Sequence, residues 1–274
     1  MTSSAARAGA AEDRRSADPQ PIGRPHLVGP GPEDHKYTRG LVTVVGGALP
    51  GAAALASLGA AHAGAGYVQL LGSERTAGLP HAIVQRAFAD AALLAAAIGD
   101  ARVGAVVIGP GLGHGERART AVAVAVASGR PLVIDADALS LLEGPIASAA
   151  ILTPHEGEFV RLFGDLAGSN WERARAGAER SGAVVVLKGG ETIVAAPDGR
   201  AAISAPLPPG LATAGTGDVL AGVCGTMLAQ MRDPFAAACA AVWVHGEAAR
   251  SLPPPFVADA LASPVLSAAV ARCW

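Results

Sequence analysis

Short apolar segments alternate with helix-forming segments along most of this 274-residue chain. The apolar segments have the length of buried strands, and several end at glycines or at an acidic residue, as at Gly46-Gly47 and at Asp135. Strands that are separated by helices indicate βαβ units and a mainly parallel sheet. A turn at 197–199 joins two further apolar segments and predicts a hairpin, so we expect the sheet to be mixed.

The same pattern predicts the individual elements and a single domain. We expect strands at 41–45, 67–71, 105–108, 131–134, 149–152, 183–187, 191–196 and 201–205. We expect helices at 51–63, 87–98, 116–128, 171–181, 216–231, 234–250 and 257–271. No internal repeat is present, and no linker follows residue 40. We therefore predict an α/β chain whose one domain covers residues 31–274, after a disordered leader over residues 1–30 that is rich in Ala, Ser, Pro and Arg.

The composition excludes several classes of partner. The net charge is −2, so there is no electrostatic argument for binding nucleic acid or an anionic membrane. The uncharged stretch 41–73 is interrupted by glycines, by Pro50 and by His62, which favours strands and a helix over a membrane span. The N-terminus lacks the apolar core of a secretion signal, and the three cysteines lack metal-ligand spacing. We expect a soluble cytoplasmic protein.

Glycines and polar residues follow the predicted strands at the ends where ligands bind. In open α/β sheets, ligands bind beyond the carboxyl ends of the strands. This rule gathers five segments along one edge of the sheet: Gly46-Gly47, Gly109–Gly113, Asp135, Thr153–Glu156 and Lys188–Gly190. The turn Gly215–Asp218 can join them from the start of the following helix.

The Gly215-Thr216-Gly217-Asp218 turn precedes a long helix-forming run that is free of charge. Glycines permit a tight turn, and a helix N-terminus attracts anions through its free N–H groups and its dipole. A carboxylate repels phosphate, so an Asp at such a site suits a base that takes a proton from a nucleophile attacking a phosphoryl group. The alternative is that Asp218 only caps the helix.

Lysine is rare in this chain, since Lys36 and Lys188 are the only lysines among 21 Lys and Arg residues. A lysine in a chain that otherwise uses arginine indicates a position that needs a compact ammonium group. Lys188 can neutralise nucleotide phosphate, and Gly189 and Gly190 permit close backbone approach. The alternative is a simple bend between two strands.

Other candidate residues have equally plain alternatives. The loop Gly109–Gly113 can form a pocket wall or a simple strand-to-helix turn. Asp135 and Asp137 can cap a helix, and Asp135 can instead hold Mg²⁺ through water or order the active site. His245 lies in an Ala-rich helix, and we assign it a structural role.

The segment Thr153–Glu156 fits a capping box, in which the Thr153 side chain caps the helix and the Glu156 side chain accepts a hydrogen bond from the Thr153 N–H. Pro154 suits the first helical turn. Capping does not account for the imidazole of His155, which is left to bind a ligand or to lie in solvent.

Together these motifs resemble the ADP-dependent (S)-NAD(P)H-hydrate dehydratase family of ribokinase-like enzymes, over about residues 33–260. The resemblance rests on seven segments: 35–36, 45–53, 109–113, 135–139, 152–159, 188–192 and 210–222. The most specific are Thr153–Phe159 and Ala212–Gly222, whereas the Gly-Thr-Gly-Asp core also occurs in other ribokinase-like kinases. The loop at Ala48-Leu49-Pro50 is shorter than in most members, and Tyr37 stands where members often have glycine.

The resemblance implies a ribokinase-like three-layer α/β/α sandwich with a mainly parallel central sheet. It implies the dehydration of the S epimer of NADH hydrate or NADPH hydrate, with ADP as co-substrate and Mg²⁺ as cofactor. Asp218 would be the base, and the N–H groups of Gly215, Thr216 and Gly217 would stabilise the transferring phosphoryl group. The nucleotide would bind at Lys188, Gly189, Gly190, Glu191, Thr192 and Gly217, and the hydrate would bind at Ala52, Gly111, His155 and Asp218.

The resemblance also implies partners. Relatives are commonly tetrameric, so we expect a homotetramer. Many relatives carry an N-terminal epimerase domain for which this chain is too short, so we expect a separate epimerase to supply the S epimer. The alternative function is a ribokinase-like kinase for a small alcohol such as a vitamin precursor, and an alternative of another class is a nucleotide-binding regulator without catalysis.

Overall fold

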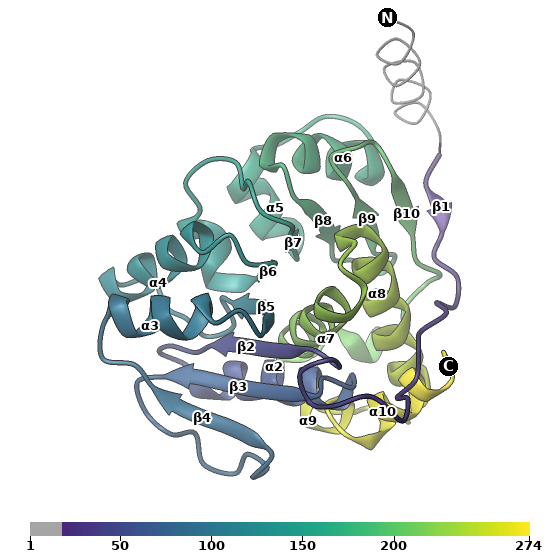
Figure 1. The fold of residues 1–274 in the computed structure, drawn as a ribbon. Coiled ribbons are helices and arrows are strands. Elements are labelled where there is room, and N and C mark those ends of the chain that lie inside the picture. The colour runs from purple at the N-terminus through teal and green to yellow at the C-terminus, as the bar shows by residue number, and fades with distance from the viewer. Residues whose placement is uncertain (1–17) are drawn as a thin grey trace, which may run out of the picture.

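A computed structural model describes residues 18–274 and contains a ten-stranded sheet (Figure 1). The strands are β1 (Gln20–Pro21), β2 (Leu41–Val45), β3 (Tyr67–Gly72), β4 (Ile83–Ala87), β5 (Val103–Ile108), β6 (Leu132–Ile134), β7 (Ala150–Leu152), β8 (Val184–Leu187), β9 (Ile193–Ala195) and β10 (Ala201–Ile203). Their order is β1-β10-β9-β8-β7-β6-β5-β2-β3-β4. Strand β9 runs antiparallel to both of its neighbours, and the other pairs are parallel, so the predicted mixed, mainly parallel sheet is confirmed.

Helices cover both faces of the sheet. One layer contains α2 (Pro50–His62), α7 (Thr216–Met231), α8 (Pro234–Arg250), α9 (Ala258–Leu261) and α10 (Pro264–Ala271). The other contains α3 (Ala91–Gly99), α4 (Glu116–Ala127), the 3-10 helix η1 (Ala136–Leu141), α5 (Glu156–Phe163) and α6 (Asn170–Ser181). The predicted three-layer α/β/α sandwich is therefore confirmed.

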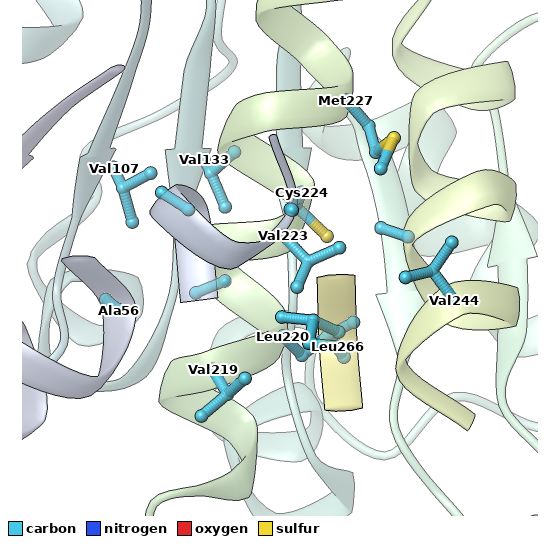
Figure 2. Packing of buried hydrophobic residues seen from close by; sticks show 14 of the residues in the cluster. Ala56, Val107, Val133, Val219, Leu220, Val223, Cys224, Met227, Val244 and Leu266 are labelled. Atoms are coloured by element: carbon cyan, nitrogen blue, oxygen red, sulfur yellow. The ribbon is translucent and has the colours of Figure 1, made fainter. Parts of the chain in front are cut away.

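The strand residues alternate between two hydrophobic cores, as the pleat of a sheet requires. In β8, Val184 and Val186 face the core beneath α7 and α8, whereas Val185 and Leu187 face the core beneath α5 and α6. Helix α7 is central to the first core, and Figure 2 shows its Cys224 and Met227 among the clustered side chains.

Helices α2 and α7 touch through their backbones, which brings both N-termini to one edge of the sheet. A Cβ at Gly222 would lie 1.9 Å from the Ala56 carbonyl oxygen, and one at Gly59 would lie 2.5 Å from the Val219 carbonyl oxygen. The Thr226 hydroxyl donates to the Ala60 carbonyl at 2.8 Å. Small residues at the crossing thus set the position of the α7 N-terminus.

Two predicted elements are wrong in their bounds. The helix predicted at 87–98 is present as α3 but begins only at Ala91, where its N-cap Asp90 accepts a hydrogen bond from the Leu93 N–H at 2.9 Å, and the strand β4 that ends at Ala87 was not predicted. Strand β4 is an edge strand with half-exposed polar residues, so it lacks a continuous apolar pattern. The helix predicted at 257–271 is divided into α9 and α10, because Ser263 caps α10 and Pro264 begins it.

The prediction of a disordered leader over residues 1–30 is wrong for residues 18–30. Strand β1 pairs with β10, and the Ile22 N–H donates to the Ile203 carbonyl at 2.7 Å. Leu27 is buried, and its N–H donates to the Cys273 carbonyl at 2.8 Å. The edge strand β10 offers unpaired backbone groups, which a composition-based prediction does not consider. Residues 1–17 lie outside the described part of the chain.

Over residues 18–274, no helix has both the length and the apolar character needed to cross a bilayer.

Candidate active site

Lys188 lies at the end of β8 and forms a largely buried ion pair with Asp135 at the end of β6. Its Nζ donates to Asp135 Oδ1 at 2.8 Å and lies 3.8 Å from Glu158 Oε2. The side chain of Asp135 is only 1% exposed and that of Lys188 is 20% exposed. Burial by itself would lower the pKa of Lys188, but the carboxylates of Asp135 and Glu158 outweigh it and raise the pKa. The lysine is therefore charged at neutral pH.

Backbone hydrogen bonds continue the pairing of β7 and β8 beyond the ends of the two strands. The Lys188 N–H donates to the Pro154 carbonyl at 2.9 Å, and His155 forms a parallel bridge with Lys188. The Lys188 side chain extends to the start of α7, where a Cβ at Gly217 would lie 3.4 Å from Nζ. The two segments that sequence motifs single out thus meet at the N-terminus of α7.

Helix α7 begins at a glycine turn without a side-chain cap. Gly215 has φ +90°, and a Cβ there would lie 2.5 Å from Leu55 Cδ1, so only glycine fits. The Thr216 N–H donates to the Thr213 carbonyl at 3.3 Å. Within residues 18–274, the N–H groups of Gly217 and Asp218 have no hydrogen-bond acceptor, as expected in a first helical turn. Together with Lys188, these two groups form a corner of positive potential that suits an anion (the anion-binding corner).

Asp218 does not cap the helix, so the capping alternative fails. Burial raises its pKa to about 7, the negative charge of Asp135 adds to this effect, and Lys188 opposes it. A carboxyl group that titrates near neutral pH is well matched to accept a proton from a hydroxyl.

His155 is itself the N-cap of α5, so the predicted capping box at Thr153 and Glu156 is wrong. Its Nδ1 accepts from the N–H groups of Gly157 at 3.0 Å and Glu158 at 3.3 Å, and Glu158 Oε2 accepts from the His155 N–H at 2.8 Å. Because Nδ1 accepts, the ring proton of the neutral imidazole is on Nε2, which lies 3.4 Å from Glu158 Oε1. The Thr153 hydroxyl is buried and has no partner among the described residues.

The loop Gly109–Gly113 is a tight turn that is packed against the segment after β6. Gly109 has φ +125°, and a Cβ there would lie 1.8 Å from the Asp135 carbonyl oxygen. The Gly113 N–H donates to Asp137 Oδ2 at 2.8 Å. The side chains of Asp135 and Asp137 therefore pair with Lys188 and with this loop, and Asp135 makes no cap to η1.

A cavity of about 450 Å³ opens beside the α7 N-terminus. Its walls include seven of the predicted residues: His155, Lys188, Gly189, Gly190, Thr192, Thr216 and Gly217. A larger cavity of about 550 Å³ lies between β1, β10 and α8, and none of the predicted site residues lines it. The cavity beside α7 is therefore the candidate nucleotide site.

The sequence profile of a protein family described as NAD(P)H-hydrate dehydratase matches residues 42–271. The chain belongs to the NAD(P)H-hydrate dehydratase family. It is 37% identical over 258 residues to the ADP-dependent (S)-NAD(P)H-hydrate dehydratase of Neisseria meningitidis serogroup B, and the match covers 87% of this chain and 86% of that protein.

Other family members are longer. The chain is 41% identical over 244 residues to the bifunctional NAD(P)H-hydrate repair enzyme Nnr of Salinibacter ruber, and the match covers 80% of this chain but 45% of that protein. The chain thus spans about half the length of the bifunctional relatives that it matches.

A solved structure of the family shares the fold. The ADP/ATP-dependent NAD(P)H-hydrate dehydratase of Bacillus subtilis, co-crystallised with ATP and Mg²⁺, matches with a TM-score of 0.76 and 31% identity. The match covers 96% of each chain.

In this dehydratase-family chain, the predicted residues fall on two sides of the α7 N-terminus. The cavity of about 450 Å³ lies on one side, and Glu191 is exposed beside it without lining it. Ala52 and Gly111 lie on the other side, where a Cβ at Gly111 would lie 2.2 Å from the Leu49 carbonyl oxygen. Asp218 lies between the two sides, and its pKa is raised by the charge of Asp135 and lowered by that of Lys188.

Two contacts at the site were not predicted from the sequence. Glu158 was missed because the capping box was placed at Glu156, although the spacing from His155 to Glu158 is also that of a capping box. The contact between His245 and Thr216 joins two helices, and no local pattern signals it.

Proposed function

We propose that the chain catalyses the ADP-dependent dehydration of the S epimers of NADH hydrate and NADPH hydrate to NADH and NADPH, releasing AMP and phosphate. The observation that carries the proposal is Asp218, a carboxyl group with a pKa of about 7 beside an anion-binding helix N-terminus and a charged lysine. Its relatives in Neisseria meningitidis and Bacillus subtilis are named NAD(P)H-hydrate dehydratases, which supports the same reaction.

The reaction divides into two steps. The β-phosphoryl group of ADP passes to the C6 hydroxyl of the hydrated nicotinamide ring, while Asp218 takes the hydroxyl proton and AMP leaves. The lone pair of the ring nitrogen then expels phosphate as the C6–O bond breaks, and loss of a proton from C5 restores the dihydropyridine. Phosphorylation is needed because hydroxide is a poor leaving group.

The chain supplies positive potential where the phosphoryl group moves. The N–H groups of Gly217 and Asp218 and the ammonium of Lys188 surround that position, in the role of an oxyanion hole. The Thr216 N–H, which the family resemblance also assigns to this role, donates to Thr213 in this structure. Gly215 supplies the turn that leaves the first N–H groups of α7 open.

The nucleotide is proposed to occupy the cavity beside Lys188, Gly189, Gly190, Thr192 and Gly217, with Glu191 at its rim. Over residues 18–274, no cluster of three or more His, Cys, Asp or Glu side chains could hold a metal ion without help. A site with one or two carboxylates fits Mg²⁺, which keeps several waters and shares nucleotide phosphates, so we propose that Asp135 holds it through water. Bound Mg²⁺ would neutralise phosphate charge.

The hydrate is proposed to lie against Ala52 and Gly111 on the far side of Asp218, with His155 between the two ligands. Because His155 Nδ1 accepts backbone hydrogen bonds, Nε2 is the ring atom that can donate to a ligand. The exposed Leu49 stands at this wall, where the shortened loop meets Gly111.

We also propose that the protein is a cytoplasmic homotetramer and works with a separate epimerase that converts the R epimer. Light scattering on the purified protein tests the tetramer, and a mixture of epimers tests the pairing. With the chain alone, only the share of the absorbance that belongs to the S epimer should return rapidly, and addition of an epimerase should restore the rest.

The deciding experiment incubates the protein with NADH hydrate, Mg²⁺ and ADP or ATP in turn. We expect the near-ultraviolet absorbance of the dihydronicotinamide to return together with free phosphate and, from ADP, AMP. No return of absorbance with either nucleotide would reject the proposal. A stable phosphorylated alcohol would indicate the kinase alternative, and nucleotide binding without any product would indicate a regulator.

A further inference from the structure

His245 of α8 is buried against the first peptide unit of α7 and takes no part in the steps described above. Its side chain is 5% exposed, and Nε2 lies 2.9 Å from the Thr216 carbonyl oxygen. We propose that His245 is a positioning residue that aligns and polarises the Thr216–Gly217 peptide, whose N–H faces the transferring phosphoryl group. This inference rests on the phosphoryl transfer proposed above.

The hydrogen bond defines the tautomer of His245. A carbonyl oxygen can only accept, so Nε2 carries the proton and donates it. Burial lowers the pKa of His245 to about 4, against the effect of the bond to Thr216, and the nearby charge of Lys188 lowers it further. The ring is therefore neutral at physiological pH, with its proton on Nε2.

The geometry of one peptide links this bond to the anion-binding corner. The Thr216 carbonyl and the Gly217 N–H belong to the same planar trans peptide, so they point in opposite directions. A donor on the carbonyl therefore orients the N–H on the other side, which has no acceptor among the described residues and lies beside Lys188. The donor also polarises the peptide, and hydrogen bonds in series strengthen one another.

This peptide needs an anchor, because Gly215 and Gly217 flank Thr216 and glycine leaves the backbone permissive. The Thr216 hydroxyl lies 2.7 Å from the Leu211 carbonyl oxygen in the short helix η2 (Pro209–Leu211), which ties the residue to the preceding loop. In a regular helix the N–H of residue 220 uses one lone pair of the Thr216 carbonyl, and His245 uses the second. The imidazole, which also lines the cavity beside α7, thus restrains the turn through the Thr216 carbonyl.

The test compares His245→Gln, whose amide N–H can replace the Nε2 donor, with His245→Leu, which fills the space without a donor. Under saturating ADP and hydrate, we expect His245→Leu to lose roughly tenfold in kcat, which is less than the loss on removing an oxyanion-hole donor directly. Because His245 also lines the proposed nucleotide cavity, the nucleotide KM can change, but it should change less than kcat, and His245→Gln should recover most of kcat. A purely packing role predicts that kcat follows thermal stability, with no advantage for glutamine, and that result would overturn the inference.

A second measurement does not depend on turnover or on the folding of a variant. In isotope-labelled wild-type protein, NMR should show the His245 proton on Nε2, and titration with inorganic phosphate should shift both that signal and the Gly217 amide. An unprotonated Nε2, or a Gly217 amide shift without any response at His245, would reject the inference. If the hydrate is not turned over but both signals respond, the dehydratase proposal fails while the coupling between His245 and the anion site stands.

Discussion

Lys188 at the end of β8 forms an ion pair with Asp135 at the end of β6, and both side chains are largely shielded from water. A buried charge that loses its partner is costly, whereas removing both partners is much less so. The pair therefore has two separable roles, since it keeps Asp135 in place and it presents an ammonium group to the α7 N-terminus. Each role can be measured by itself.

Replacing Lys188 by methionine should destabilise the protein by about 3–5 kcal/mol, because Asp135 is left buried and unpaired. Adding Asp135→Asn to Lys188→Met should restore part of the loss in urea unfolding, although nucleotide affinity stays low. Lys36→Met is the matched control, because Lys36 is the other lysine of the chain and is exposed; its Nζ lies 5.0 Å from the centre of the Tyr37 ring, so the substitution should cost at most about 1 kcal/mol. Equal stability of the single and double Lys188 variants would show that the ion pair has no such role.

The raised pKa of Asp218 predicts the pH dependence of turnover. A base must be ionised, so kcat/KM should rise about tenfold per pH unit below pH 7 and level off above it, since the pKa of Asp218 is about 7. Asp218→Asn should remove this dependence and lower kcat by about 10²–10⁴-fold, while nucleotide binding is largely kept. A variant that binds nucleotide poorly but turns over normally would contradict the role of Asp218 as a base.

Among the elements, α7 supplies both its N-terminus to the site and most of its length to the core (Figure 2). Its position depends on the contact with α2, where glycines allow the two backbones to touch. Stability and site geometry are therefore linked through a single helix crossing.

Gly222→Ala tests this crossing. The added methyl group would lie 1.9 Å from the Ala56 carbonyl oxygen, which is a backbone atom, so the helices must separate. We expect a loss of roughly 1–3 kcal/mol in the free energy of unfolding. Gly99→Ala in α3 is the control, because its methyl group would meet nothing within 4 Å, and it should leave stability unchanged or raise it by up to about 1 kcal/mol. If both variants have the same melting temperature, the close crossing does not limit stability.

At the scale of the whole molecule, the segment that contains β1 joins the edge of the sheet to the C-terminal helix α10 (Figure 1). It pairs with β10, buries Leu27 beside α10 and brings Gly29 against Trp274, where a Cβ would lie 3.1 Å from the indole ring. Residues far apart along the chain thus close one side of the fold.

Deleting residues 1–29 should lower the melting temperature by about 5 °C relative to deleting residues 1–17. Burial of Leu27 alone is worth about 1.5–3 kcal/mol, and each kcal/mol corresponds to about 2–4 °C in a domain of this size. Differential scanning calorimetry of the two truncated proteins measures the difference. Equal melting temperatures would mean that the segment from 18 to 29 contributes no net stability.

Much of this architecture could be predicted from local sequence. The order of strands and helices, the bounds of α7 and α8, and the edge at which Lys188 and Asp218 lie follow from periodicity and from glycine positions, which are properties of neighbouring residues. Strand β4 and the segment from 18 to 30 could not be predicted this way, because both are ordered by pairing with a sheet edge that forms elsewhere. The cap at His155 was local, but imidazole is an unusual capping group and the more common residue, Thr153, was preferred.

Only the tertiary structure shows which side chains contact one another. The sequence places an acid on a glycine turn and a rare lysine after a strand, and the type of chemistry follows from those residues alone. Three features are consequences of packing. Lys188 pairs with Asp135, burial brings the pKa of Asp218 to about 7, and His245 donates a hydrogen bond to Thr216. Each of these interactions joins groups that are distant along the chain. The strength of an electrostatic interaction depends on how completely water is excluded around it, and no short stretch of sequence specifies this.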